Sequence, residues 1–274
     1  MNLPDFKYER PQNLDAALEL LRGNPQARVL AGGQTLIPAL KQRLDRPSVL
    51  IDLRAIAELR GIEVSSTHVS VGAMTRHAEI AAHADIGMAI PALRHLASGI
   101  AHPQVRNMGT IGGSIANNDP AADYPAAVVG LDATVETTKR RIPADAFFTG
   151  LFETALEPEE LVLRVHFRVP RRAGYHKIAN QASGYVTVGC FIAAFDGQIR
   201  VAVNGAGPCV FRQADFEAAL RANWSPDAIR DLKQDPATMN EDMHASKRYR
   251  AHLVAVAAAR ALNMAAGGLE MEKA

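Results

Sequence analysis

The residues best suited to chemistry in this chain are two glycine pairs with polar neighbours. One pair is Gly112 and Gly113, which lies in the sequence between two residues with hydroxyl side chains, Thr110 and Ser114. Glycine has no side chain, so the backbone there can adopt positive φ and bring its N–H groups against a bulky anion. The pattern therefore indicates a phosphate-binding turn.

A second glycine pair has similar surroundings. Residues 29–36 read Val-Leu-Ala-Gly-Gly-Gln-Thr-Leu, an apolar strand-like run that breaks at Gly32 and Gly33 and continues into Gln34 and Thr35. One such pair alone is most often an ordinary turn. Two strand-to-glycine turns followed by polar side chains indicate two halves of one diphosphate.

Two carboxylates, Asp119 and Asp123, follow the pair Gly112 and Gly113 in the sequence. Carboxylate oxygens accept hydrogen bonds from sugar hydroxyls, and a phosphate next to a sugar describes a nucleotide. For Asp119 the alternative is that it caps a turn before Pro120. From the sequence alone both interpretations stay open.

The composition excludes several classes of function. Lys and Arg number 30 against 29 Asp and Glu, so the charge gives no reason to expect nucleic acid or an anionic membrane as partner. Only Cys190 and Cys209 occur, too few for an iron–sulfur cluster or a zinc site. Residues 1–11 are polar, and no stretch approaches the roughly 18 apolar residues that span a bilayer. We therefore expect a soluble, cytoplasmic chain.

Hydrophobic periodicity predicts the elements that must position these residues. Residues 1–54 are predicted to form a small βαβ-like unit with a helix over 14–22 capped by Asn13, a strand over 29–31, a helix over 38–44 and a strand over 49–52. Residues 55–170 are predicted to form a second unit with a hairpin over 61–72, helices over 76–84 (capped by Thr75), 89–97 and 144–148, and strands over 134–137 and 161–167. Residues 171–274 follow a linker-like Pro170–Gly174 and are predicted to contain a hairpin around Asp196-Gly197 and helices over 213–220, 226–232 and 244–264.

Four ordered motifs resemble one known family, and the match spans nearly the whole chain. They are Ala31-Gly32-Gly33-Gln34-Thr35, Arg106-Asn107-Met108-Gly109-Thr110-Ile111-Gly112-Gly113-Ser114, Asp119-Pro120-Ala121-Ala122-Asp123 and Tyr249-Arg250-Ala251-His252-Leu253. Together they resemble the FAD-binding medium subunit of molybdenum hydroxylases, the xanthine dehydrogenase and carbon monoxide dehydrogenase family. The resemblance implies an α+β fold of the vanillyl-alcohol-oxidase (PCMH) type, with two FAD-binding subdomains and a C-terminal β-sheet and helix-bundle domain. It is not a Rossmann fold, and no Gly-x-Gly-x-x-Gly occurs.

The resemblance also implies roles for individual residues. The FAD diphosphate would be held by backbone N–H groups of Ala31, Gly32, Gly33, Gln34, Thr35, Leu36, Thr110, Ile111, Gly112, Gly113 and Ser114. Asp123 would bind a polar part of the cofactor, and Lys177 would lie near the flavin, where a cation favours the anionic reduced ring. Tyr185 would cover the isoalloxazine face. The alternative for Tyr185 is a core tyrosine that begins a strand.

The same resemblance implies the partners and an electron-relay function. A large subunit with a molybdopterin cofactor would oxidise the substrate, and a small subunit with [2Fe–2S] clusters would pass electrons to this FAD, in a dimer of heterotrimers. Many relatives have Arg at the position of Gln181 and Asp at that of Gly184, so the electron-acceptor surface near Tyr185 differs here. The substrate (carbon monoxide, an N-heteroaromatic, a purine or an aldehyde) and the final acceptor stay open.

Two other functions remain as alternatives, a stand-alone flavin oxidoreductase of the same fold and a non-catalytic flavin-binding assembly protein. A stand-alone enzyme would need its own acid–base residue, and the sequence offers no persuasive candidate. Cys190 lies in an apolar run and is expected to be a small buried hydrophobe. For His102 a structural role is expected, and the histidines show no metal-ligand spacing. No side chain is therefore assigned as catalytic.

Overall fold

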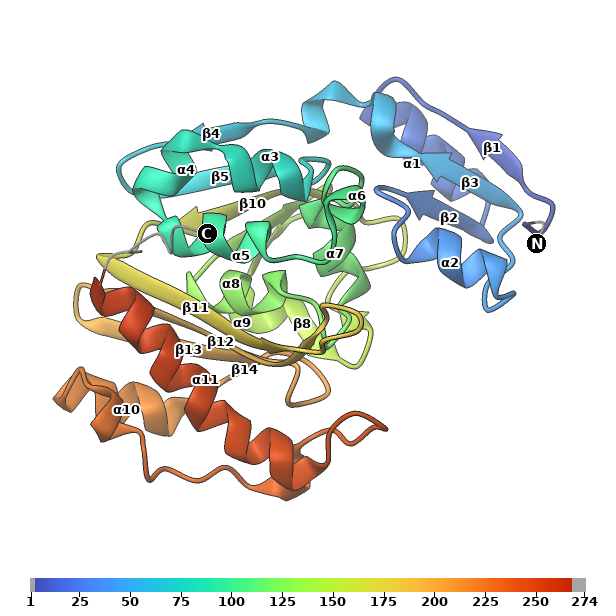
Figure 1. Ribbon diagram of the computed structural model, residues 1–274. Helices are drawn as coiled ribbons and strands as arrows, with labels where there is room; N and C mark the ends of the chain where they lie inside the picture. The colour runs from blue at the N-terminus through green and yellow to red at the C-terminus, as the bar shows by residue number, and fades with distance from the viewer. Residues whose placement is uncertain (1–2, 268–274) are drawn as a thin grey trace.

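The first part of the chain forms a small parallel sheet with helices packed beside it. In the computed structural model, which describes residues 3–267, the strand order is β1-β3-β2 (Figure 1). The elements are β1 (Lys7–Glu9), α1 (Leu14–Gly23), β2 (Ala27–Leu30), α2 (Leu36–Lys41), β3 (Val49–Asp52), η1 (Leu53–Ala55) and η2 (Ala57–Leu59). The side chain of Asn13 accepts the N–H of Ala16 at 2.9 Å, which confirms the predicted cap of α1.

The second part forms an antiparallel sheet in the order β4-β5-β10-β6-β7. Its strands are β4 (Ile62–Val64), β5 (His68–Gly72), β6 (Thr134–Thr137), β7 (Arg141–Pro143) and β10 (Val162–Arg168), and a hairpin of β8 (Phe148–Gly150) and β9 (Glu153–Thr154) precedes β10. The helices are α3 (His77–Ala82), α4 (Ala84–Ala89), α5 (Pro91–Ser98), α6 (Pro103–Arg106), α7 (Ile111–Asn117), α8 (Tyr124–Gly130) and α9 (Ala144–Phe147). The predicted hairpin and the strand over 134–137 are confirmed.

One predicted helix cap in this part is wrong. Arg76, not Thr75, is the N-cap residue of α3, and its backbone N–H donates to the Glu79 carboxylate at 2.8 Å. The Thr75 hydroxyl instead donates to the carbonyl of Gly61 at 3.2 Å. Thr75 therefore ties the start of the helix to the adjacent hairpin.

The last part forms an antiparallel meander, β11-β12-β13-β14, with two longer helices. Its elements are β11 (Arg172–Ala179), β12 (Val186–Phe195), β13 (Gln198–Asn204), β14 (Phe211–Arg212), α10 (Ala214–Ala222), η3 (Pro226–Ala228), η4 (Pro236–Thr238) and α11 (Lys247–Gly267). The predicted hairpin turns at Gly197, where φ is +74°. The predicted helix over 226–232 is wrong, since only the short turn η3 forms there, and α11 begins later than predicted.

The linker predicted at Pro170–Gly174 is also wrong, because β11 begins at Arg172 and pairs with β12. Gly174 is part of the strand because α11 crosses it closely. A Cβ on Gly174 would lie 2.0 Å from the carbonyl oxygen of Ala261. The glycine therefore serves strand–helix packing and not a flexible connection.

The meander lies between two layers of helices (Figure 1). Helices α10 and α11 cover one face, while α5 and α8 contact the other. Both faces are therefore buried, which explains why β12 reads as a continuous apolar run. The inner face, with Tyr175 and Phe191, shares one hydrophobic core with the second sheet.

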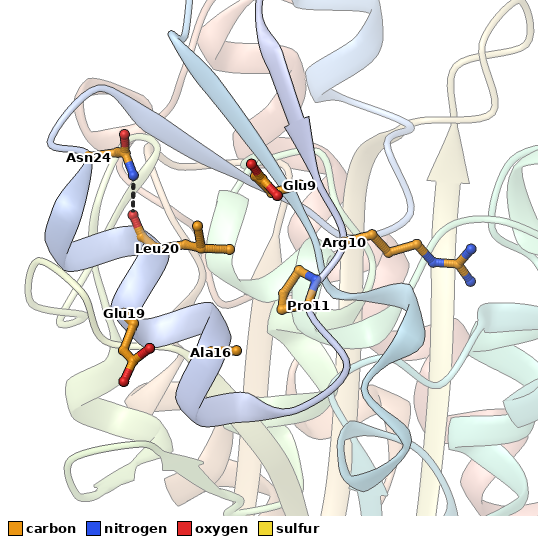
Figure 2. A pocket seen from close by; sticks show the side chains of 7 residues that line it. All are labelled: Glu9, Arg10, Pro11, Ala16, Glu19, Leu20 and Asn24. Carbon is orange, nitrogen blue, oxygen red and sulfur yellow. Dashed lines mark hydrogen bonds between the residues drawn. The ribbon is translucent and has the colours of Figure 1, made fainter.

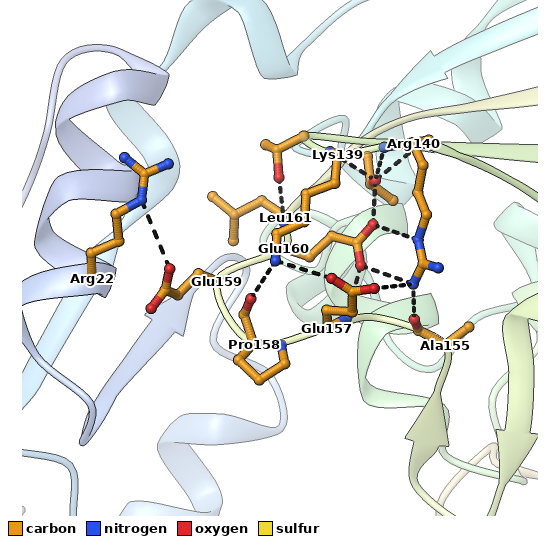
Figure 3. A network of polar contacts seen from close by, with 11 residues as sticks. Arg22, Lys139, Arg140, Ala155, Glu157, Pro158, Glu159, Glu160 and Leu161 are labelled. Carbon is orange, nitrogen blue, oxygen red and sulfur yellow. Dashed lines mark hydrogen bonds and ion pairs between the residues drawn. The ribbon is translucent and has the colours of Figure 1, made fainter.

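A polar network joins the loop before β10 to the turn between β6 and β7 (Figure 3). The Glu160 carboxylate accepts hydrogen bonds from Thr137 Oγ1 at 2.6 Å and from Arg140 Nε at 3.2 Å. From the neighbouring Glu159, an ion pair of 3.8 Å reaches Arg22 of α1. The network thus anchors a loop that also contacts the first part of the chain.

Candidate functional site

The Thr110–Ser114 segment is the start of helix α7 and not a glycine turn. Thr110 is its N-cap residue, and its Oγ1 accepts the N–H of Gly113 at 3.3 Å. Neither Gly112 nor Gly113 has positive φ, so that expectation is wrong. The remaining N–H groups also donate within the chain, from Ile111 to Thr75 O (3.1 Å), from Gly112 to Ala73 O (2.9 Å) and from Ser114 to Thr110 O (3.0 Å).

The glycines of α7 are required for close packing. A Cβ on Gly112 would lie 2.5 Å from the Cβ of Ala73, a distance that real side chains do not tolerate. A Cβ on Gly113 would lie 3.0 Å from Thr110 Oγ1 and 3.2 Å from the Cβ of Ala31. Helix α7 therefore lies directly against Ala73, just after the end of β5, and against Ala31, which precedes Gly32 and Gly33.

The pair Gly32 and Gly33 has a different geometry. Gly33 has a φ of +72°, and the chain then turns into α2 at Leu36. Within the described part of the chain, none of the five backbone N–H groups from Gly32 to Leu36 donates a hydrogen bond to a protein acceptor. Gln34 and Thr35 are exposed. This segment therefore presents a row of free donors at the surface, which suits an anion.

The two segments meet, as the sequence predicted. A Cβ on Gly32 would lie 2.4 Å from the carbonyl oxygen of Met108 and 2.6 Å from the Cα of Gly109. Gly32 thus packs on the residues just before α7, while Ala31 contacts Gly113. Segments far apart in the sequence form one continuous surface.

The loop before α8 is fastened to the meander by a buried polar cluster. Asp123 is only 6% exposed, and its carboxylate accepts the hydroxyl of Tyr175 at 2.8 Å and the ammonium of Lys177 at 3.0 Å. Burial raises the pKa of Asp123, and the ion pair with Lys177 opposes that shift. Lys177 also donates to the carbonyls of Gly99 at 2.8 Å and Gly184 at 3.1 Å. The three ammonium protons are thus matched by three protein acceptors.

Further hydrogen bonds from the meander hold the carbonyl groups of the same loop. Gly205 donates to Pro120 O at 2.8 Å, and the side chain of Asn204 donates to Ala122 O at 2.6 Å. Val186, at the start of β12, donates to Ala121 O at 3.1 Å. The loop therefore has a fixed position relative to the segment that carries Tyr185.

Tyr185 does not belong to the core. Its side chain is 49% exposed, which contradicts the alternative of a core tyrosine. It directly precedes β12 and follows Gly184, whose carbonyl binds Lys177. The aromatic ring is therefore available to cover a ligand beside the Asp123 loop.

Several other candidates have structural roles. Asp119 Oδ1 accepts the N–H of Ala121 at 2.8 Å, so it caps the turn, one of its two predicted roles. Cys190 is fully buried, and burial raises the pKa of its thiol, in agreement with the predicted inert hydrophobe. His102 occupies the N-cap position of α6 without a side-chain cap.

Sequence reasoning missed Tyr175 and Asn204. The signal for Tyr175 was its position two residues before Lys177, because alternate residues of a strand share a face. Asn204 gave no comparable signal. It ends β13 and its partner is a main-chain carbonyl far away in the sequence.

A separate surface pocket of about 400 Å³ lies between α1 and the segment after β1 (Figure 2). It is lined by Glu9, Arg10, Pro11, Ala16, Glu19, Leu20 and Asn24. None of these is a predicted site residue. Among the described residues there is neither a group of three His, Cys, Asp or Glu placed to hold a metal ion nor a helix long and apolar enough to cross a membrane.

Comparison with known proteins gives consistent matches over nearly the whole chain. Residues 4–171 match the family model described as the FAD binding domain in molybdopterin dehydrogenase. The glyceraldehyde dehydrogenase medium chain of Sulfolobus acidocaldarius is 34% identical, with 92% of this chain and 95% of that protein covered. The carbon monoxide dehydrogenase medium chain of Hydrogenophaga pseudoflava is 32% identical, with 96% and 97% covered.

A solved structure agrees in fold. A chain of reconstituted CO dehydrogenase from Oligotropha carboxidovorans superposes with a TM-score of 0.89 at 30% identity, and 97% of this chain and 99% of that chain are covered. The mixed helix and sheet architecture is therefore that of these subunits. The chain belongs to the family of FAD-binding domains of molybdopterin dehydrogenases, and it is an FAD-binding oxidoreductase subunit of that class.

Proposed function

We propose that this chain is the FAD-binding medium subunit of a molybdenum hydroxylase, which relays electrons from [2Fe–2S] clusters of a partner subunit through FAD to an external acceptor. The observation that carries the proposal is the surface formed by the two glycine segments. The five N–H groups from Gly32 to Leu36, which have no acceptor among residues 3–267, lie beside the start of α7. That arrangement suits the diphosphate of a dinucleotide.

The residues present fit FAD at several points. From Gly32 onward, the N–H groups of the Ala31–Leu36 segment have no acceptor in the part of the chain that the structure describes. They would bind the diphosphate together with the hydroxyls of Thr110 and Ser114. Gly112 and Gly113 would contribute through the close approach that their missing side chains allow. That close approach brings α7 against Ala73 and Ala31, and so holds the start of α7 beside the free N–H groups of the described chain.

The Asp123 loop would bind a polar part of the cofactor, and Tyr185 would cover the isoalloxazine ring. Lys177 would act near the flavin mainly by holding three segments together, since the carbonyls of Gly99 and Gly184 and the Asp123 carboxylate accept its protons. Its positive charge is largely balanced by Asp123. These contacts orient the cofactor and exclude water from one face.

Bound FAD accepts electrons one at a time and releases them in pairs, which suits a junction between iron–sulfur clusters and a two-electron acceptor. The chain's own residues then only bind, orient and shield the cofactor. No side chain has to move a proton.

The finer description of the fold is part of the proposal. We assign a vanillyl-alcohol-oxidase (PCMH) type of FAD-binding domain with subdomains 1–54 and 55–170, followed by a C-terminal domain 171–274. The three larger sheets, one in each of these residue ranges, support this division. One buried cluster belongs mainly to the first unit and one to the outer face of the meander.

The proposed partners are a molybdenum-binding large subunit and a [2Fe–2S] small subunit, in a dimer of heterotrimers in the cytoplasm. Relatives are named as medium chains of dehydrogenases for glyceraldehyde and carbon monoxide, and one as the medium subunit of nicotine 6-hydroxylase. These substrates differ widely. The substrate is therefore a property of the large subunit and stays open for this chain.

Purification of the tagged chain from its own cells tests the proposal. We expect one FAD per chain, released on denaturation, together with iron, molybdenum and two further polypeptides. A colourless chain that stays colourless when FAD is added would overturn the assignment. FAD without metals or partner chains would favour a stand-alone flavin oxidoreductase instead.

A further inference from the structure

The hydroxyl of Tyr175 lies in the interior beside the Asp123 loop. Tyr175 is 2% exposed, and its ring packs against Phe191 of the next strand with 5.9 Å between ring centroids. Its hydroxyl donates to Asp123 Oδ1 at 2.8 Å. Two donors from one strand face, Tyr175 and Lys177, therefore converge on a single buried carboxylate.

This carboxylate is the only part of the loop for which two side chains supply hydrogen bonds within the described residues. The preceding carbonyls of Pro120, Ala121 and Ala122 are each bound by the meander. With the backbone held in this way, the remaining freedom of Asp123 is rotation of its side chain. Tyr175 and Lys177 fix that rotation.

We propose that Tyr175 is a positioning residue for the cofactor: its hydroxyl orients the Asp123 carboxylate that binds FAD, and it thereby sets the FAD affinity. The inference rests on the proposed function, because it assumes that Asp123 contacts FAD. Tyr175 itself acts through Asp123. A carboxylate that two donors already hold in one orientation loses little conformational entropy when the ligand binds, and the Tyr175 hydroxyl is one of these donors.

The chain contains a matched tyrosine for comparison. Tyr124 is adjacent to Asp123 in sequence and is fully buried. Within the described part of the structure, however, its hydroxyl has no hydrogen-bond partner. Its ring packs at 5.2 Å from that of His77. Removing this hydroxyl changes the buried volume as in Tyr175 but breaks no hydrogen bond.

Tyr175 also affects the charge state of Asp123. The groups that face this carboxylate are Lys177 and Tyr175 from β11 and Tyr124 from α8. His95 of α5 faces Lys177, and burial, with a smaller contribution from Lys177, lowers the pKa of His95. Burial already raises the pKa of Asp123. Loss of the Tyr175 hydrogen bond, which favours the charged form, raises that pKa further.

The experiment compares full-length wild type, Tyr175→Phe and Tyr124→Phe. Each protein is stripped of flavin and titrated with FAD between pH 5 and 8, with flavin fluorescence as the readout and thermal unfolding recorded in parallel. We expect Tyr175→Phe to weaken FAD binding by about tenfold, the effect of one lost hydrogen bond to a charged group. We also expect its affinity to fall at a higher pH than that of wild type. Tyr124→Phe should bind FAD as wild type does.

A second variant keeps the test decisive. Asp123→Asn is nearly isosteric and does not titrate, so the pH dependence assigned to Asp123 should disappear, and adding Tyr175→Phe should cause little further loss. Additive losses in the double variant would overturn the proposal. So would equal FAD affinity and pH profile for Tyr175→Phe and Tyr124→Phe, whatever their unfolding temperatures. Wild type that binds no FAD would instead refute the proposed function itself.

Discussion

The two glycine pairs look alike in sequence, but the structure uses them differently. The N–H groups from Gly32 to Leu36 have no protein acceptor in the described part of the chain, whereas those from Ile111 to Ser114 all donate to protein oxygens. Gly33 has positive φ, while Gly112 and Gly113 are helical. The first segment therefore presents donors, and the second supports it.

In these two pairs, glycine marks a close approach of another chain segment more often than it marks a positive φ. Gly32, Gly112 and Gly113 each leave out a Cβ that would meet a neighbouring segment. Only Gly33 of the four is required for its conformation. The predictions below test this division of roles.

The largest effect is expected for Gly32→Val. Its Cβ would lie 2.4 Å from the Met108 carbonyl, a backbone atom that has little freedom to move. We expect FAD to be lost and the free energy of unfolding to fall by about 3 kcal/mol or more. Gly113→Val is the comparison, because its nearest neighbours are side-chain atoms at 3.0 and 3.2 Å. It should lose FAD at a smaller cost in stability, as measured by urea unfolding; equal costs would contradict the distinction.

The second prediction concerns His77, which packs against Gly109, just before the Ile111–Ser114 segment. Burial, with a smaller contribution from Arg106, lowers its pKa to about 4. The unfolded chain then binds more protons between pH 6.5 and 4, so stability falls as the pH drops through that window. The loss amounts to about 3 kcal/mol. His77→Asn should remove this part of the pH dependence of stability. The carboxylates titrate in both proteins, so their contribution cancels in the difference between wild type and variant. If wild type and His77→Asn lose stability in parallel as the pH falls, the loss does not come from His77.

Gly33→Ala should have an intermediate effect. With a φ of +72°, a Cβ there is strained by about 1–2 kcal/mol, and it would also lie 3.1 Å from Ile37. Gly23→Ala is the matched control, because it has no positive φ and no atom within 4 Å of its added Cβ. Thermal unfolding should show a loss for Gly33→Ala and little change for Gly23→Ala. No difference between them would mean that Gly33 is not conformationally required.

The smallest effect separates the two threonines. Thr110 caps α7 with its side chain, and Thr110→Ala should cost about 1 kcal/mol of stability. Thr35 occupies the same position in α2 but makes no side-chain cap. Thr35→Ala should leave the unfolding midpoint nearly unchanged. A stability loss as large as that of Thr110→Ala would contradict the comparison.

Regular local patterns made parts of the fold predictable. Helix α1 has both an amphipathic face and the Asn13 cap, and the strand over 134–137 has alternating burial. Helix α7 was not predictable, because its two glycines are poor helix formers and its two isoleucines are only moderate ones. The Thr110 cap and the packing against Ala73 stabilise the helix there. The short polar strand β1 forms only because it pairs with β3.

The site was predictable as far as its main-chain segments and less so in its side chains. The convergence of the two glycine pairs followed from their shared pattern. The donors that hold Asp123 did not, because Tyr175 lies far away in sequence and reads as an ordinary strand aromatic. Likewise, the sequence suggested Lys177 as a flavin partner, while the structure shows its protons bound by protein oxygens.

Hydrogen–deuterium exchange of the full-length chain with and without FAD tests the central claim most directly. In the absence of FAD, the amides from Gly32 to Leu36 should exchange fast, because no protein acceptor in the described chain protects them. FAD should slow exchange most in this segment, with a smaller change at Ile111–Ser114, where the amides are already bonded. Unchanged exchange at Gly32–Leu36 in a chain saturated with FAD would contradict the account.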